Sequence, residues 1–112
     1  MIARMWHGKV HKERAKDYHQ YLIKTGLKDY GAVPGNEGVF LLKKDDGDAT
    51  HFYTLTFWRD YESIKIFAGE EYEKARYYPE DADFLLEFEP FVSHFEVLEG
   101  SMSSMTRNFK SI

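Results

Sequence analysis

The four residues SHFE, near the end of the chain, contain the first side chains that could do chemistry. If they lie on a strand, His94 and Glu96 leave the same face about 7 Å apart. A carboxylate at that distance can orient an imidazole, so the pair could act as a catalytic base, or both groups could reach one ligand. The alternative is a structural pair that hydrogen-bonds across an interface between two copies of the chain. We predict no metal site, because nothing in the spacing fixes a third ligand from His7, His51 or Glu89.

The sequence RYYP supplies a second group of candidates, Arg76, Tyr77 and Tyr78, directly before Pro79. A tyrosine at the end of a helix can bury its ring and leave its hydroxyl for a ligand. One of the two could donate a hydrogen bond to a carbonyl or phenolate oxygen while Arg76 attracts the negative charge. The alternative is packing, with one ring in the core and the other at the surface. The acidic residues that follow are expected to be solvated.

These side chains must be positioned by elements that the hydrophobic pattern predicts. Residues 2–10 carry apolar side chains on both parities, which is typical of a strand covered on both faces. Residues 12–25 have apolar positions at three- and four-residue steps, which predicts an amphipathic helix that ends at Gly26. Residues 30–38 hold three glycines and a proline and predict a loop.

The second half of the chain continues with a hairpin. Residues 38–44 and 51–58 flank the turn KDDGDA, which predicts two paired strands. Asp60 is the predicted N-cap of a helix over residues 61–68, and Gly69 closes that helix. The remaining predicted elements are a second short helix over residues 70–78 that Pro79 ends, a helical turn over residues 80–88, and a strand over residues 91–98.

This order of elements predicts an α+β fold of the ferredoxin-like type, a four-stranded antiparallel sheet with helices on one face. The helices can cover only that face, yet the strands are apolar on both. Phe52 and Trp58 point one way, whereas Tyr53 and Phe57 point the other. An uncovered sheet face with aromatic residues would favour aggregation of a monomer. We therefore predict a homodimer in which two sheets pack face to face as a dimeric α+β barrel.

Composition excludes several other classes of protein. A chain of 112 residues that is 43% hydrophobic predicts a single domain, over residues 1–99, followed by a polar, flexible tail over residues 100–112. A net charge of -4 gives no basic face, so nucleic acid is not an expected partner. The absence of cysteine excludes disulfides and thiolate ligands. The apolar runs are too short to cross a membrane and the start of the chain lacks the order of a signal peptide, so we expect a cytoplasmic protein.

Longer stretches of the sequence resemble a known family. A first strand with Trp6, the stretch VPGNEGVFLL, and the stretch FYTLTFWRDYESIKIFAG together are similar to antibiotic biosynthesis monooxygenase domains. The resemblance spans roughly residues 2 to 98. It implies a dimeric α+β barrel with a pocket between the helices and the sheet of each protomer. Activities of this family include cofactor-free oxygenation of polyketide-derived phenols to quinones, and haem degradation.

The resemblance also implies roles for single residues. Trp6 and Phe67 would be walls of the pocket, where a tryptophan favours a flat aromatic ligand. Trp6, Arg76 and Tyr77 match three of the residue types that quinone-forming relatives use. Haem-degrading relatives have an asparagine, a tryptophan and a histidine where this chain has Trp6, Phe67 and Tyr77, and none of the three matches. We therefore expect no haem and no other cofactor.

We thus predict a cofactor-independent monooxygenase that acts on a small aromatic or polyketide-like compound. The predicted catalytic residues are His94, Tyr77 and Arg76, and the predicted ligand-binding residues are Trp6, Phe67, Tyr78 and Glu96. One alternative is a non-catalytic homodimer, binding small ligands or associated with stress, that uses the same pocket. A haem-degrading monooxygenase is a further alternative.

Overall fold

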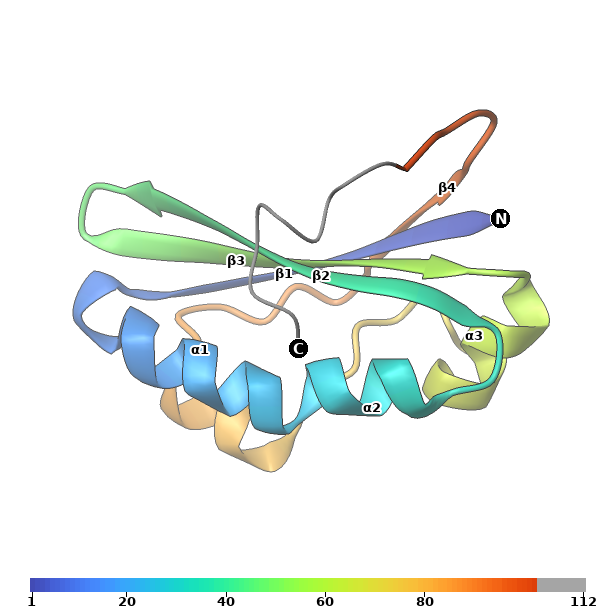
Figure 1. The fold of residues 1–112 in the computed structure, drawn as a ribbon. Coiled ribbons are helices and arrows are strands. Elements are labelled where there is room, and N and C mark those ends of the chain that lie inside the picture. Colours follow the sequence, from blue (N-terminus) through green and yellow to red (C-terminus); the bar gives the residue numbers. More distant parts are fainter. Residues whose placement is uncertain (103–112) are drawn as a thin grey trace.

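The computed structural model describes residues 1–102, which form one sheet and a layer of helices (Figure 1). The strands are β1 (Ile2–His11), β2 (Asn36–Asp46), β3 (Ala49–Trp58) and β4 (Ser93–Glu96). The α-helices are α1 (Ala15–Lys24), α2 (Gly26–Ala32) and α3 (Tyr61–Ala68), and two short 3-10 helices are η1 (Lys12–Arg14) and η2 (Pro79–Asp83). The predicted α+β fold is confirmed.

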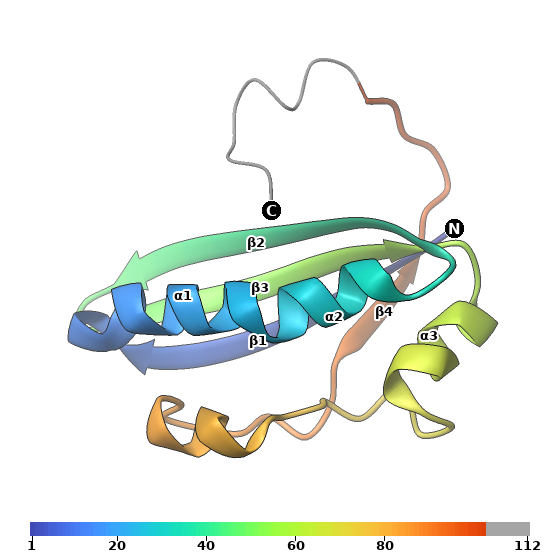
Figure 2. The same ribbon diagram turned by 60° about the horizontal axis from the view of Figure 1, so that its bottom comes forward.

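The four strands form one antiparallel sheet in the order β2-β3-β1-β4. All the helices lie on one side of it, with α1 and α2 running along the strands and α3 near one end (Figures 1 and 2). In the sheet register, Arg4 of β1 is opposite Thr56 of β3 on one side and His94 of β4 on the other. Residues opposite one another in an antiparallel pair point to the same face, so these three side chains share a face.

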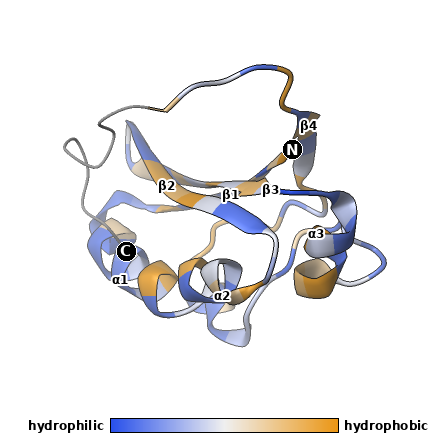
Figure 3. Ribbon diagram, turned by 45° about the vertical axis from the view of Figure 1, so that its right-hand side comes forward, coloured by the Kyte–Doolittle hydropathy of each residue, from blue (hydrophilic) through white to orange (hydrophobic). Residues whose placement is uncertain are grey.

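The face towards the helices holds the core. Alternate residues of β3 are buried there, and Tyr18 of α1, Leu27 of α2 and Ile64 of α3 close over them. The largest fully buried apolar side chains are Trp58, Tyr18, Phe52, Leu27, Ile64 and Val10. In Figure 3, hydrophobic residues interrupt hydrophilic ones along the helices, as expected of elements with one buried face.

The opposite face of the sheet carries apolar side chains with no helix over them, and we call it the open face. Its residues include Met5 of β1, Phe40 of β2, Leu55 and Phe57 of β3, and Phe95 of β4. Phe95 is 54% exposed and Leu42 is 40% exposed. The prediction of strands that are apolar on both faces is therefore confirmed for β1 and β3.

Two predicted elements differ from the structure. The first helix ends just before Gly26 as predicted, since α1 closes at Lys24, but the chain then bends at Thr25 (φ -115, ψ -98) and continues as a second helix, α2, into the predicted loop. The bend turns Leu27 and Tyr30 onto the sheet, where both are buried. The strand predicted over residues 91–98 is shorter, because only Ser93–Glu96 pairs with β1.

The helix predicted over residues 70–78 is also absent, and this segment is irregular. Apart from one turn, in which the amide of Lys74 donates to the carbonyl of Glu71 at 3.0 Å, its backbone bonds to the segment around Pro90. The amide of Ala75 donates to the carbonyl of Pro90 at 2.9 Å, and the amide of Val92 donates to the carbonyl of Glu73 at 2.9 Å. Pairing with a distant segment replaces the helical bonds, although acidic residues early in residues 70–78 and basic residues late in them favour a helix.

Most of the tail predicted over residues 100–112 lies outside the described residues, and nothing tests its flexibility. Over residues 1–102, no helix has both the length and the apolar character needed to span a membrane.

Candidate functional site

Three polar side chains on the helix-facing side of the sheet have buried nitrogen atoms without a hydrogen-bond partner: Arg4 and Trp6 are buried, and His94 is half-buried. Arg4 is 1% exposed, and its Nε and Nη2 have no hydrogen-bond partner. The indole Nε1 of Trp6 and the Nε2 of His94 are buried and unpartnered as well. Buried polar groups without a partner are uncommon in folded proteins and need an explanation. We call Arg4, Trp6 and His94 the polar triad.

The strands themselves bring the triad together. Arg4 and Trp6 are two residues apart on β1 and so share a face, and β4 places His94 directly opposite Arg4. Gly8 follows on the same face and leaves room for the indole. A Cβ at Gly8 would lie 2.4 Å from Cη2 of Trp6 and 3.0 Å from Cδ2 of Leu85. A glycine at this position is therefore required for the observed position of the Trp6 ring.

Burial changes the electrostatics of the triad. Burial, and to a smaller extent the charge of the neighbouring Arg4, together lower the pKa of His94 to about 4. Burial also lowers the pKa of Arg4, although a hydrogen bond from its Nη1 to the Tyr30 hydroxyl, at 3.5 Å, opposes that shift. At neutral pH the triad thus combines one cation, one neutral imidazole and one indole N–H. Such a set can bind an anionic or carbonyl oxygen.

Aromatic rings surround the triad. The guanidinium carbon of Arg4 lies 5.6 Å from the centre of the Phe67 ring. His94 lies between two tyrosines, with ring centres 5.9 Å from Tyr61 and 5.3 Å from Tyr72. A flat aromatic ligand would therefore meet both π-faces and hydrogen-bond donors here.

Two of the residues predicted from RYYP lie next to this region. The Tyr77 ring packs edge-on against Trp6 at 6.1 Å, and its hydroxyl donates to the carbonyl of Glu89 at 2.5 Å. Arg76 donates from Nη1 to the carbonyl of Phe67 at 2.8 Å, and its guanidinium carbon lies 4.8 Å from the centre of the Phe67 ring. Burial raises the pKa of Tyr77, so its phenol is protonated at neutral pH.

The other two predicted residues, Tyr78 and Glu96, make different contacts. The Tyr78 hydroxyl donates to the carboxylate of Asp29 in α2, and burial raises the pKa of Tyr78. Glu96 is exposed, opposite Ile2 in the sheet, and makes no hydrogen bond or ion pair with His94. The structure therefore places Phe67 and His94 next to one residue that the sequence analysis missed, with Arg76 on the same Phe67 ring and Tyr77 against Trp6.

That residue is Arg4. The sequence does contain a sign of this residue. Arg4 alternates with Ile2 and Trp6 along β1, so its side chain points to the face of the strand that holds the core. A charged residue at such a position is buried and therefore costly unless it is paired.

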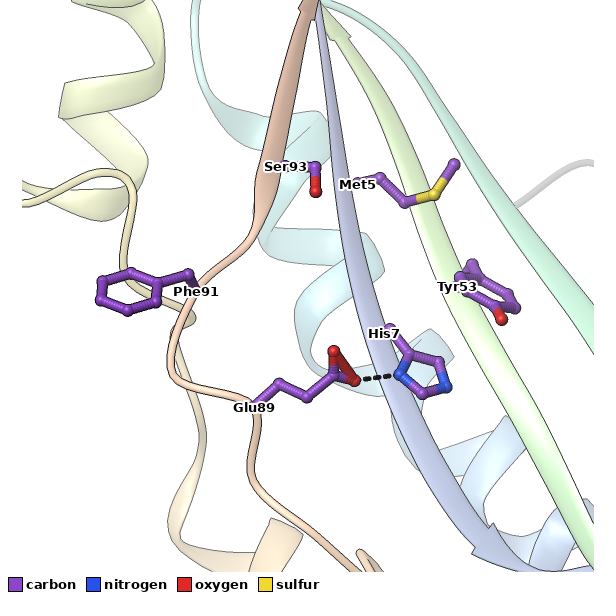
Figure 4. Close-up of a pocket in the computed structure, with 6 residues that line it drawn as sticks. All are labelled: Met5, His7, Tyr53, Glu89, Phe91 and Ser93. Atoms are coloured by element: carbon purple, nitrogen blue, oxygen red, sulfur yellow. Dashed lines mark hydrogen bonds and ion pairs between the residues drawn. The ribbon is translucent and has the colours of Figure 1, made fainter.

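A second group of titratable side chains lies on the open face (Figure 4). His7 of β1 binds the carboxylate of Glu89 through Nδ1, and its Nε2 lies 2.7 Å from Nδ1 of His51. A pocket of about 290 Å³ adjoins this group. The pocket is lined by Met5, His7, Tyr53, Glu89, Phe91 and Ser93. One atom each of His7, Glu87 and Glu89 can converge within 4.8 Å, an arrangement that could hold a cation.

Comparison with known proteins gives matches in structure but not in sequence. No family model matches the chain. No curated protein matches it either. Among solved structures, it is similar to Rv0793 from Mycobacterium tuberculosis, with a TM-score of 0.58 and 13% identity over 90% of this chain and 98% of that one. It is also similar to a variant of MhuD with two manganese protoporphyrin IX molecules bound per active site, with a TM-score of 0.58 and 16% identity over 92% of this chain and 100% of that one.

At these identities the similarity is one of fold. Both matches extend over nearly the whole of each chain, so the sheet and the helical layer correspond together. The resemblance inferred from the sequence is confirmed at this level: the chain has the ferredoxin-like fold of antibiotic biosynthesis monooxygenase domains.

Proposed function

We propose that this protein binds a small, planar aromatic compound with an acidic or carbonyl oxygen, and oxygenates it without a cofactor. The observation that carries the proposal is the polar triad, whose donors are buried and unpartnered. A ligand oxygen would satisfy the free nitrogens of Arg4. Phe67, Tyr61 and Tyr72 would contact the faces or edges of the ring.

The chemistry proposed for this site needs only the substrate and molecular oxygen. Arg4 stabilises the phenolate or enolate form of the substrate, because its charge lies beside the oxygen that becomes negative. His94 is neutral at neutral pH and can accept the proton that the substrate loses. The electron-rich substrate then reduces O₂. A ring CH₂ becomes a quinone carbonyl with one oxygen atom, and the other oxygen atom leaves as water with the two hydrogens.

We also propose that the protein works as a homodimer through its open face. The face is apolar, and the helices cover only the opposite side of the sheet. A second copy of the same sheet would bury residues such as Leu55 and Phe95 across a two-fold axis.

The residues around the triad do not fit a haem. The Phe67 ring lies 4.5 Å from Tyr30 and 6.0 Å from Trp58, so packed side chains fill the space beside Arg4. At the position that the resemblance assigns to an iron ligand, the hydroxyl of Tyr77 is already bound to a backbone carbonyl. A macrocycle would have to separate these rings, whereas a one- to three-ring compound demands less rearrangement.

Oxygen consumption and calorimetry test the proposal together. Anthrone and dihydroxynaphthalene are suitable probes, since each can form an electron-rich anion. We expect binding with oxygen uptake above the uncatalysed rate, and we expect Arg4→Met to abolish both. Arg14→Met is the matched control, because Arg14 stacks at 4.5 Å on the exposed side of Phe84 and lies outside the triad.

The outcomes separate the candidate functions. Binding that Arg4→Met abolishes, without oxygen uptake, would identify a non-catalytic ligand-binding protein. If neither probe binds, or if binding is unchanged in Arg4→Met, the site is wrongly assigned. A Soret shift on addition of haem that Arg4→Met abolishes would contradict the conclusion that haem does not fit.

A further inference from the structure

We propose that His7, Glu87 and Glu89 form a binding site for a divalent transition-metal ion at the margin of the open face. One ligand atom from each of the three lies within 4.8 Å of the other two. An imidazole nitrogen with two carboxylates is a donor set that suits Zn²⁺, Mn²⁺, Fe²⁺ and Co²⁺. This site is on the opposite side of the sheet from the polar triad and does not depend on the proposed oxygenation.

The backbone holds the two glutamates against β1. Their segment follows the free edge of β1 beyond the end of β4. The amide of Leu86 donates to the carbonyl of Lys9 at 2.8 Å, and the carbonyl of Glu89 accepts from the Tyr77 hydroxyl at 2.5 Å. Glu87 lies between these two anchors. The ligands therefore come from a fixed segment and not from a free loop.

The contacts of the two histidines leave a place for a cation. The contact between His7 Nε2 and His51 Nδ1, at 2.7 Å, uses one nitrogen of each ring. The other two nitrogens face carboxylates, because His7 Nδ1 binds Glu89 and His51 Nε2 lies 3.8 Å from Asp46. Two neutral imidazoles have only two N–H groups for these three contacts. One nitrogen is therefore left bare against a carboxylate unless the pair gains a positive charge.

A metal ion at His7 Nδ1 removes that conflict. His7 then keeps its proton on Nε2 and donates it to His51, whose own proton on Nε2 points at Asp46. All four nitrogens are satisfied while both rings stay neutral. This is the usual arrangement around a metal-bound histidine, whose second nitrogen is oriented by a hydrogen bond to another group.

The negative charge at the site also favours a bound metal ion. Glu87 makes no hydrogen bond or ion pair within residues 1–102. No lysine or arginine of the described chain pairs with Glu87 or Glu89. A divalent ion at this point neutralises both carboxylates. Three protein ligands also leave coordination positions open towards the adjoining pocket of about 290 Å³.

Titration of the untagged, full-length chain with Zn²⁺ and Co²⁺ tests this site. We expect saturable binding of one ion per chain by calorimetry, and a shift of the His7 ring nitrogens by NMR. Glu87→Gln should weaken binding by at least about tenfold, since even the loss of an outer partner of a metal ligand costs that much. His51→Gln should weaken it by a similar factor by removing the group that orients His7.

Glu70→Gln is the control, because Glu70 is an exposed glutamate that follows α3 and lies outside the cluster. It should bind as the wild type does. Glu87 is itself exposed, so its replacement leaves the core intact. The proposal is overturned if no saturable binding occurs, if Glu87→Gln binds unchanged, or if the ion shifts the rings of His11 or His19 and leaves His7 unaffected.

Discussion

Arg4 destabilises the fold, and in the proposed function it binds the ligand. Its side chain is buried, and only Nη1 has a partner, a tyrosine hydroxyl at 3.5 Å. An incompletely paired buried charge destabilises a fold, and apolar residues of similar size often replace such groups without loss. The arginine is therefore best explained by what it binds.

Replacing Arg4 should separate stability from binding. We expect Arg4→Met to raise the free energy of unfolding by about 1 kcal/mol, because it removes unsatisfied donors. The same change should weaken binding of an anionic aromatic compound at least about tenfold. Urea denaturation and calorimetry measure the two effects.

Thr56→Val is the contrasting variant. The Thr56 hydroxyl accepts from Trp58 Nε1 at 2.8 Å and donates to the carbonyl of Arg4 at 3.3 Å. Without this hydroxyl the buried indole N–H of Trp58 has no acceptor, so the free energy of unfolding should fall by roughly 1 to 3 kcal/mol. If Arg4→Met destabilises as Thr56→Val does, Arg4 is a structural residue.

His94 should make stability depend on pH. Its pKa is about 4 in the folded protein and about 6.5 when unfolded, so the unfolded state binds the proton first. The stability that neutral His94 contributes is present above about pH 6.5 and is lost as the pH falls towards 4. Between pH 7 and pH 5 the wild type should lose roughly 1 to 2 kcal/mol more than His94→Gln. Equal losses in denaturation experiments at the two pH values would contradict the assignment.

For single residues, the sequence predicts which side chains could take part in a site but not which residues they contact. His94, Tyr77 and Arg76 were found because imidazole, phenol and guanidinium groups are conspicuous near aromatic residues. Their partners depend on strand register, which joins Arg4 to a residue 90 positions away. Because no local pattern encodes that pairing, Arg4 was overlooked.

Among the elements, β1 depends on one glycine. A methyl group at Gly8 would meet the Trp6 ring at 2.4 Å and Leu85 at 3.0 Å. Gly8→Ala should therefore lower the free energy of unfolding by roughly 1 to 3 kcal/mol, because the added methyl group overpacks the core. It should also weaken ligand binding, because the indole of Trp6 must move. Gly31→Ala is the control in α2, where an added methyl group meets nothing within 4 Å. It should be neutral or slightly stabilising, since alanine favours a helix. Thermal unfolding of both variants gives the comparison.

The irregular segment before η2 depends on Asp81, which is 3% exposed. Its carboxylate accepts from the Tyr18 hydroxyl at 2.8 Å and from the amide of Tyr78 at 2.7 Å. Asp81→Ala should cost roughly 2 to 3 kcal/mol, because both donors lose their partner in a buried place. Glu80→Ala removes only an exposed contact with Tyr21 and should cost less than about 0.5 kcal/mol. Chemical denaturation curves that coincide for the two variants would refute this account.

Local sequence signals, such as a helix cap, predict an element correctly where no tertiary contact opposes them. Asp60 caps α3 as expected, with its carboxylate accepting from the amide of Ser63 at 2.9 Å. The charge order of residues 70–78 also favoured a helix, but pairing with residues 90–92 prevailed. A tertiary contact of this kind overrides a weak local preference, and the sequence gives no sign of it.

For the whole molecule, the open face predicts association. Leu55→Asp would place a charge among Met5 and Phe40 on that face, so the proposed homodimer should dissociate. Ile66→Asp is the control, since Ile66 is 68% exposed on α3 on the other side of the molecule. Sedimentation at micromolar concentration should give a dimer for the wild type and for Ile66→Asp, and a monomer for Leu55→Asp. A monomeric wild type would refute the proposed assembly.

The two tryptophans also give the molecule an optical reporter. Trp58 is fully buried and its indole N–H is already bound to Thr56, so its emission should stay constant while the fold is intact. The buried indole N–H of Trp6 has no hydrogen-bond partner, and Trp6 is two residues from Arg4 on the same face of β1. Any compound that enters there changes the surroundings of one fluorophore and leaves the other as an internal reference.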